Sequence, residues 1–355
     1  MKRALLTLLL TMLAAGPVCA DNAADTSTEG DAGVRTLKVI GSWSMLSQYK
    51  NYELPFWSQT VPKLSEGTLK AEITPFNDLG LKGGEVLRMM KLGLTDFGTT
   101  ILSYVSEQDP RAEGVDLAGL TTDLASSHKV ADAYLPVLDG YFRKKHGVRV
   151  LALWPYSAQE LMCTSPIKSL SELKGKKVRV SLRTTSDLIE AYGATTLNIP
   201  FDQVYDKMKA GEIDCLITGT LSANTAKLYE VTSHLYNLPL GWSVLMLAVN
   251  NNSWEQLTPK EKAALNKGIA QLSSELWQAA NAQTELGLAC NSGSDACNLP
   301  TKGQMTIVAP AAADKARLKQ LVKQVVVKRW LERCGNECRD EWNKTAGQAA
   351  GVAIP

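Results

Sequence analysis

A twelve-residue pattern occurs twice in this chain and constrains the fold more than any other feature of the sequence. Residues 85–96 and 203–214 share the spacing V-x-x-x-M-K-x-G-x-x-D. Each copy is typical of a helix that ends at a glycine, because glycine adopts the left-handed conformation of a helix end without steric cost. A short predicted strand follows each copy, at 97–100 and at 215–218. The copies are too far apart for a solenoid, whose repeats span about 20–50 residues. The pattern therefore predicts two α/β lobes of similar build.

Further predicted strands alternate with helices along the chain. They lie at 36–41, 70–74, 148–154, 177–180 and 244–249. Such alternation predicts mainly parallel sheets, whose ligands bind outside the carboxyl ends of the strands. A long helix begins at the capping box Thr258-Pro-Lys-Glu261 and reaches about Leu288. Its length is roughly 45 Å at 1.5 Å per residue, so we expect it to span both lobes.

The first twenty residues have the order of a secretory signal peptide. A basic start at Met1-Lys2-Arg3 precedes an apolar run at 4–15, and small residues lead to Ala20. The apolar run is shorter than the roughly 20 residues of a membrane span. We therefore predict a signal peptide at 1–20, cleaved after Ala20, and a flexible polar leader at 21–35. A lipoprotein anchor at Cys19 is the alternative, although Gly16-Pro17-Val18 is a poor lipidation signal.

The charge balance of the exported chain limits the classes of partner that it can bind. Lys2 and Arg3 leave with the signal peptide and no acid does, so the 38 basic residues fall to 36 and equal the 36 acidic ones. A neutral protein lacks the broad basic surface that nucleic-acid binding requires. The mean hydropathy of -0.10 also excludes a polytopic membrane protein, and we expect no stable membrane insertion.

The cysteine count predicts disulfide bonds, which form in an oxidising compartment. Loss of Cys19 reduces the 7 cysteines to an even number. We predict disulfides Cys290–Cys297 and Cys334–Cys338, because each pair brackets a short polar turn. Cys163 and Cys215 lie in apolar segments, where a bridge and two small core residues are about equally good interpretations.

The motifs of common enzymes are absent from the sequence. There is no G-x-S-x-G elbow, H-E-x-x-H zinc motif, P-loop or G-x-G-x-x-G turn. The chain has three scattered histidines, His128, His146 and His234, and none lies near the cysteine pairs to complete a zinc site. We therefore expect no enzyme activity, no metal and no cofactor.

Three motifs in the central region carry a family resemblance. Pro166–Val180 contains the core Leu-Lys-Gly-x-Lys-x-Arg-Val, and Pro200-Phe-Asp-Gln-Val-Tyr205 and Gly211-Glu-Ile-Asp214 follow it. In this order and spacing the chain resembles the DctP-type substrate-binding proteins of tripartite ATP-independent periplasmic (TRAP) transporters. The resemblance covers roughly residues 36–345 and is strongest at 163–219.

The resemblance implies a fold and a role. The expected fold is α/β: a two-lobed periplasmic binding protein, or clamshell, with a mixed, mainly parallel sheet in each lobe. Lobe I is expected at 36–152 plus about 242–275, lobe II at 153–241 plus about 276–345, and a tail at 346–355. Such a protein, expected as a monomer in the periplasm, closes on a small organic acid and delivers it to the integral membrane subunits of the transporter.

Arg179 is the principal candidate for binding the ligand. The resemblance places a carboxylate-binding arginine at this position, and a guanidinium matches a carboxylate with two parallel N–H donors. The resemblance also shows two departures, Gln159 where many members carry a second arginine and Thr218 where many carry asparagine. Losing one cation favours a monocarboxylate, because a second carboxylate would be buried without its partner. Arg183 is a weaker candidate for a second charge.

Aromatic residues near the expected cleft suggest an apolar or aromatic ligand tail. Trp43 follows the first strand, and Trp242 and Tyr156 lie at the two crossovers between lobes. Thr100 ends the predicted strand after the first copy of the pattern, as Thr218 ends the strand after the second. We therefore expect both hydroxyls in the cleft. The other tryptophans are expected in the core: Trp57, Trp254, Trp277, Trp330 and Trp342.

Two other classes of function stay open at this point. The binding protein of an ATP-driven importer would have the same two-lobed architecture and would close on its ligand in the same way. A secreted hydrolase is the less favoured alternative, and it would turn its substrate over.

Overall fold

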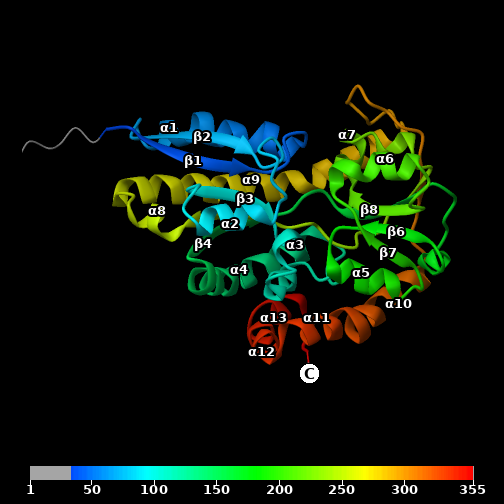
Figure 1. Ribbon diagram of the computed structural model, residues 1–355. Helices are drawn as coiled ribbons and strands as arrows, with labels where there is room; N and C mark the ends of the chain where they lie inside the picture. The colour runs from blue at the N-terminus through cyan, green and yellow to red at the C-terminus, as the bar shows by residue number, and fades with distance from the viewer. Residues whose placement is uncertain (1–32, 355) are drawn as a thin grey trace, which may run out of the picture. The chain divides into compact units, whose positions relative to one another are not determined.

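Two β-sheets organise the fold, and the chain passes back and forth between them (Figure 1). The computed structural model describes residues 33–354, so the predicted signal peptide, Cys19 and most of the predicted leader lie outside the described residues. Arg35, the last residue assigned to the leader, already belongs to the first strand, where it pairs with Leu69.

The first sheet has the strand order β2-β1-β3-β10-β4. Its strands are β1 (Arg35–Gly41), β2 (Leu69–Pro75), β3 (Phe97–Ile101), β4 (Val148–Trp154) and β10 (Leu245–Asn250). The strands β2, β1 and β3 are parallel, and β10 runs antiparallel between β3 and β4. Every residue of β10 is buried, as expected of a continuous apolar run in a central strand.

The second sheet has the strand order β11-β9-β5-β8-β6-β7. Its strands are β5 (Gln159–Cys163), β6 (Lys177–Val180), β7 (Thr195–Asn198), β8 (Cys215–Gly219), β9 (His234–Tyr236) and β11 (Thr306–Val308). The strands β7, β6 and β8 are parallel, and β5 is antiparallel to β8. Both sheets are therefore mixed, as predicted.

Helices cover the two sheets. Those packed on the first sheet include α1 (Val61–Leu64), α2 (Glu85–Lys91), α3 (Leu102–Val105), α4 (Leu124–His146) and α8 (Asn251–Glu255). Those beside the second include α5 (Arg183–Glu190), α6 (Val204–Lys209), α7 (Thr220–Thr225) and α10 (Ala312–Leu321). The five tryptophans expected in the core are all buried.

The repeated pattern has the same structure in both lobes. The copies form α2 with β3 and α6 with β8, and Gly93 and Gly211 adopt φ values of 68° and 70° at the helix ends. The aspartate that closes each pattern accepts a hydrogen bond from the backbone N–H of the neighbouring parallel strand. These bonds run from Lys38 to Asp96 at 2.8 Å and from Lys177 to Asp214 at 2.7 Å. The aspartate thus joins each helix–strand unit to its sheet.

The predicted long helix is α9 (Pro259–Ser292), which begins with the predicted capping box. It contacts β4 and α1 on one side and α7 and β11 on the other, so it spans both lobes (Figure 1). Gly287 permits the closest approach: a Cβ there would lie 2.3 Å from the backbone nitrogen of Leu221 in α7. A side chain at this position would therefore force α7 and α9 apart.

All three predicted cysteine pairs are disulfides in the structure: Cys163–Cys215, Cys290–Cys297 and Cys334–Cys338. The first pair had two open interpretations, and the sheet decides between them. Cys163 and Cys215 are directly opposite one another on the antiparallel strands β5 and β8. They therefore form a buried cross-strand bridge.

The C-terminal helices pack on elements that precede the second sheet in the sequence. They are α11 (Val327–Cys334), α12 (Asn336–Lys344) and α13 (Ala346–Ala350). The α13 helix contacts α4, and α11 and α12 contact the 3₁₀ helix η3 (Pro110–Val115). Residues 327–345, assigned from the sequence to lobe II, thus contact first-lobe elements, and α11 also contacts α5 beside the second sheet. The expected tail contains the packed helix α13. The complete lobe boundaries stay a prediction.

Candidate ligand-binding site

Two adjoining cavities lie where the carboxyl ends of both sheets' parallel strands meet. The larger, here called the outer cavity, has a volume of about 920 Å³. The smaller, called the inner chamber, has about 30 Å³, which is room for about one water molecule. Both are lined by residues that follow strands of the first sheet and by residues that follow or belong to strands of the second. The side chains shared by the two cavities are Trp43, Tyr104, Arg179 and Ser181.

Arg179 is a buried cation without an anionic partner. It lies on β6, is 2% exposed and lines both cavities. Its Nε donates to the carbonyl of Ile199 at 2.9 Å, and its Nη1 donates to the carbonyl of Ile217 at 3.2 Å. Among residues 33–354, no carboxylate forms an ion pair with it, and its Nη2 has no protein acceptor. Burial lowers the pKa of Arg179 to about 10, so the guanidinium is still charged at pH 7.

The two backbone bonds orient this guanidinium without neutralising it. A charge taken out of water without a partner is unfavourable by several kcal/mol. An anion entering the cavities would find unused N–H donors on a pre-oriented, planar group. The geometry of Arg179 is thus that of an anion-binding site.

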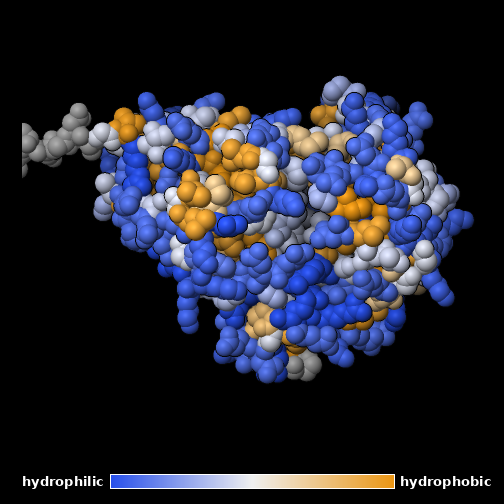
Figure 2. Space-filling view, in the orientation of Figure 1, coloured by the Kyte–Doolittle hydropathy of each residue, from blue (hydrophilic) through white to orange (hydrophobic). Residues whose placement is uncertain are grey.

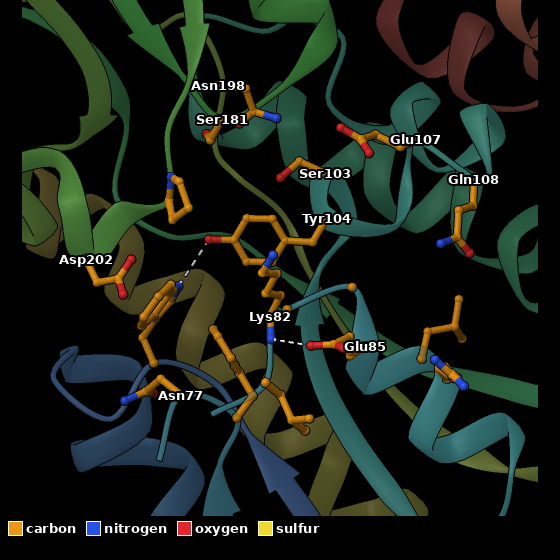
Figure 3. Close-up of a pocket in the computed structure, with 18 of the residues that line it drawn as sticks. Asn77, Lys82, Glu85, Ser103, Tyr104, Glu107, Gln108, Ser181, Asn198 and Asp202 are labelled. Atoms are coloured by element: carbon orange, nitrogen blue, oxygen red, sulfur yellow. Dashed lines mark hydrogen bonds between the residues drawn. The ribbon is translucent and has the colours of Figure 1, made fainter. Parts of the chain in front are cut away.

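Aromatic rings line the space beside Arg179. Trp43 and Phe76 make an edge contact at 4.6 Å between ring centroids, and Trp43 reaches Phe201 of the other lobe at 6.0 Å. The indole Nε1 of Trp43 donates to the hydroxyl of Tyr104 at 3.2 Å (Figure 3). Trp43 and Tyr104 therefore form an amphipathic wall on the first-lobe side of the site.

Three more predicted residues line the inner chamber. They are Gln159, Thr218 and Tyr156. The Gln159 side chain donates to the carbonyl of Ser157 at 2.9 Å. The chamber thus gathers an amide and several hydroxyls behind Arg179 without adding a second cation.

The structure places the other two predicted residues elsewhere. Trp242 lines neither cavity: its indole Nε1 donates to the carbonyl of Thr121 at 3.3 Å. Thr100 also lines neither, because its hydroxyl is fully buried and donates to the carbonyl of Gly83 at 2.7 Å. Both expectations are corrected, since each polar group is already bonded to backbone from a distant segment.

Arg183 does not supply a second charge to the site. Its Nε donates to Glu113 at 2.7 Å, and its Nη2 bonds to the carbonyl of Ser106. Glu113 also pairs with Arg333 of α11 at 2.8 Å. These contacts join α5 to the first-lobe helix η3 and direct the Arg183 guanidinium away from the cavities.

Several lining residues were not predicted, although one sequence signal points to them. The carboxyl ends of parallel strands are where α/β sheets bind ligands. Phe76 follows β2, Tyr104 follows β3 closely, and Ser181 follows β6 directly. Phe201 and Asp202 lie in the Pro200–Tyr205 motif itself. The positions after each predicted strand would therefore have identified most of the lining.

Residues 44–332 match the DctP family, described as bacterial extracellular solute-binding protein, family 7. The chain belongs to this family. This confirms the resemblance carried by the central motifs, and it makes the protein a solute-binding protein rather than an enzyme. No helix within residues 33–354 is long and apolar enough to cross a membrane. In the same part of the chain, no cluster of three or more His, Cys, Asp or Glu side chains could hold a metal ion.

Relatives of this DctP-family chain are distant in sequence. It is 23% identical over 229 residues to the sialic acid-binding periplasmic protein SiaP of Vibrio cholerae, covering 64% of this chain and 71% of SiaP. It is 24% identical to the 2,3-diketo-L-gulonate-binding periplasmic protein YiaO of Escherichia coli, covering 57% of this chain. The match spans 62% of YiaO, less than two thirds of its length.

Solved structures confirm the two-lobed fold of this DctP-family protein. The pyroglutamic acid receptor DctP7 of Bordetella pertussis superposes with a TM-score of 0.78 at 18% identity, covering 88% of this chain and 99% of DctP7. A TRAP periplasmic solute-binding protein of Desulfovibrio salexigens with bound orotic acid gives 0.78 at 17% identity, covering 89% and 98%.

Glu160, next to Gln159 on β5, is a buried acid that makes stability depend on pH. Both its carboxyl oxygens are buried without a hydrogen-bond partner among the described residues. Burial, followed by the charge of Glu285, raises the pKa of Glu160 to about 8. Between the unfolded pKa near 4.5 and this value, the unfolded chain loses a proton that the folded chain retains. The free energy of unfolding should therefore fall as pH rises, by about 1.4 kcal/mol per pH unit from this group.

We expect Glu160→Gln to remove this slope. Urea unfolding at pH 5, 6, 7 and 8 gives the free energy of unfolding of each protein. The value for the variant should rise relative to that of the wild type by about 1.4 kcal/mol per pH unit. Glu72→Gln, at an exposed position of β2, is the control and should leave the profile unchanged. Parallel profiles for wild type and Glu160→Gln would contradict the assignment.

Proposed function

We propose that this protein captures a small organic acid anion in the periplasm and delivers it to the membrane subunits of a TRAP transporter. The observation that carries the proposal is Arg179, a buried guanidinium whose hydrogen bonds within residues 33–354 go to two backbone carbonyls. A carboxylate is its natural complement, because the two groups form paired, charge-assisted hydrogen bonds. The names of the relatives and structural neighbours also mention acids, including sialic acid, pyroglutamic acid and orotic acid.

We further propose that the ligand carries one carboxylate. Gln159 stands where many family members have a second arginine, and Arg183 is paired with Glu113. Arg179 is thus the one buried cation among the described residues that line the cavities. A second carboxylate next to it would lack a buried counter-charge.

Closure of the two lobes would complete the site. Arg179, Thr218 and Gln159 belong to the second sheet, whereas Trp43 and Tyr104 follow strands of the first. A ligand favours closure only by the contacts that it gains in the closed state. Contacts with the Trp43–Tyr104 wall would provide that gain once the carboxylate is held by Arg179.

The route to the periplasm belongs to the same proposal. The family is described as extracellular, and the signal peptide proposed at 1–20 would export the chain. The three disulfides suit an oxidising compartment. We propose that the exported protein acts as a monomer.

Mass spectrometry of ligand released from the purified protein tests the proposal. The expected result is one small carboxylic acid per chain, which rebinds stoichiometrically in calorimetry and is recovered unchanged after prolonged incubation. Release of a neutral or purely cationic molecule that rebinds tightly would overturn it.

A further inference from the structure

Arg179 and Asp202 present opposite charges to one cavity without pairing with each other. Asp202 lies in η5 (Phe201–Gln203), between β7 and α6, and its exposed side chain lines the outer cavity with Arg179. No ion pair within 4.0 Å joins them, nor does Asp202 pair with another cation in the described residues. The two charges are close enough that Asp202 opposes the fall in the Arg179 pKa that burial causes. Because the two charges share the cavity lining without an ion pair, each is free to bind a different group of one ligand.

The cavity that holds the two charges is also lined by aromatic rings. Trp43 and Tyr104 line the outer cavity together with Phe76. Figure 3 shows the Asp202 carboxylate and the Tyr104 hydroxyl on the same side of the cavity, where Trp43 donates to that hydroxyl. Aromatic faces attract cations through their quadrupole, and most strongly where water is excluded. The Asp202 carboxylate and the aromatic rings of the same cavity are therefore both groups that attract positive charge in a ligand.

The other charges of the outer cavity lie apart from this pair. Lys82, Arg88 and Lys91 belong to α2 and the turn before it, and Glu85 there accepts a hydrogen bond from the backbone of Lys82. Glu107 also lines the cavity, and the view in Figure 3 places it on the opposite side of Tyr104 from Asp202. Asp202 is therefore the acid placed to act on a ligand held by Arg179.

We propose that the ligand is a zwitterion whose carboxylate binds Arg179 and whose cationic nitrogen lies between Asp202 and the Trp43–Tyr104 wall. This inference rests on the proposed function, because it takes Arg179 as the carboxylate site, and it adds the substrate class. Asp202 is then a specificity residue: it distinguishes a zwitterion from an ordinary organic acid of the same shape. A zwitterion also adds no net charge to the closed site.

Matched pairs of ligands that differ only in the cationic nitrogen test the proposal. Glycine betaine and 3,3-dimethylbutanoate have the same shape, as do γ-butyrobetaine and 5,5-dimethylhexanoate, and L-proline is paired with tetrahydrofuran-2-carboxylate. Affinities are measured by calorimetry on the wild type, Asp202→Asn and the control Glu107→Gln. We expect the wild type to prefer the zwitterion at least tenfold in the pair that it binds. Asp202→Asn should abolish that preference, and Glu107→Gln should keep it.

The outcomes separate this inference from the proposed function. If the anionic isosteres, which lack the cationic nitrogen, bind as tightly as the zwitterions, or if Asp202→Asn keeps the preference, the inference is overturned and carboxylate capture stands. The same holds if no zwitterion binds at millimolar concentration while a simple monocarboxylate does. If the protein binds no carboxylate at all, both proposals are overturned.

Discussion

Replacing Arg179 by methionine is expected to abolish ligand binding while the fold persists. The two charge-assisted hydrogen bonds that a carboxylate can form with a guanidinium contribute about 1.5–3 kcal/mol each. Their loss should weaken binding by about 10²- to 10⁴-fold. Calorimetry with the co-purified acid measures this change. The free energy of unfolding should be unchanged or higher, because replacing an unpaired buried charge by an apolar side chain removes a desolvation penalty.

Two further variants test whether the forked geometry and the position of Arg179 cause the loss of binding. Arg179→Lys keeps the charge but loses the forked donors, so we expect it to bind much more weakly than the wild type. Arg88→Ala removes an exposed arginine of the same outer cavity and should bind nearly normally. Normal affinity in Arg179→Met, or an equal loss in Arg88→Ala, would contradict the assignment of Arg179 as the carboxylate site.

Removing the Cys163–Cys215 disulfide is expected to destabilise the protein more than removing another bridge. This bond closes a loop with a sequence separation of 52, for which the loss of loop-closure entropy corresponds to about 4 kcal/mol. Replacing both cysteines by alanine should lower the free energy of unfolding by about that amount. Denaturant titration of the oxidised wild type and the double variant measures the difference.

The Cys290–Cys297 bridge provides a control for the effect of loop length. Its sequence separation is 7, so the same relation gives about 2 kcal/mol for its removal. The double-alanine variant at this pair should therefore be the more stable of the two. Equal losses in both variants would show that Cys163–Cys215 does not act by restricting the unfolded chain.

Local sequence was enough to predict the framework of each lobe. The glycine of the repeated pattern acts within a few residues, so its role could be inferred from spacing. The aspartate bonds to a strand 58 or 37 residues away in the sequence, and only the fold reveals its role. The capping box at Thr258 and the apolar repeat after it likewise predict α9 from local rules. The Cys290–Cys297 pair spans a single turn, which is why the bridge could be expected without the fold.

Pairing across the sheet lies beyond such rules. The sequence shows only that Cys163 and Cys215 lie in apolar segments. The pairing of β5 with β8 places them opposite one another, where they form the bridge. The packing of α13 on α4 also depends on contacts between segments that are far apart in the sequence. The assignment of the C-terminal helices to a lobe stays a prediction for the same reason.

By itself, the sequence predicted two α/β lobes and a helix joining them, because periodicity and helix caps are local. The family resemblance, not local chemistry, singled out Arg179 on a second-lobe strand. Only the tertiary structure decided which polar groups are free to meet a ligand. Thr100 and Thr218 occupy equivalent places, yet Gly83 takes the hydroxyl of Thr100 whereas Thr218 lines the inner chamber. Glu113 likewise pairs with Arg183 and keeps it out of the site, whereas Arg179 bonds to two backbone carbonyls. In each case the bonding partner comes from a distant part of the chain.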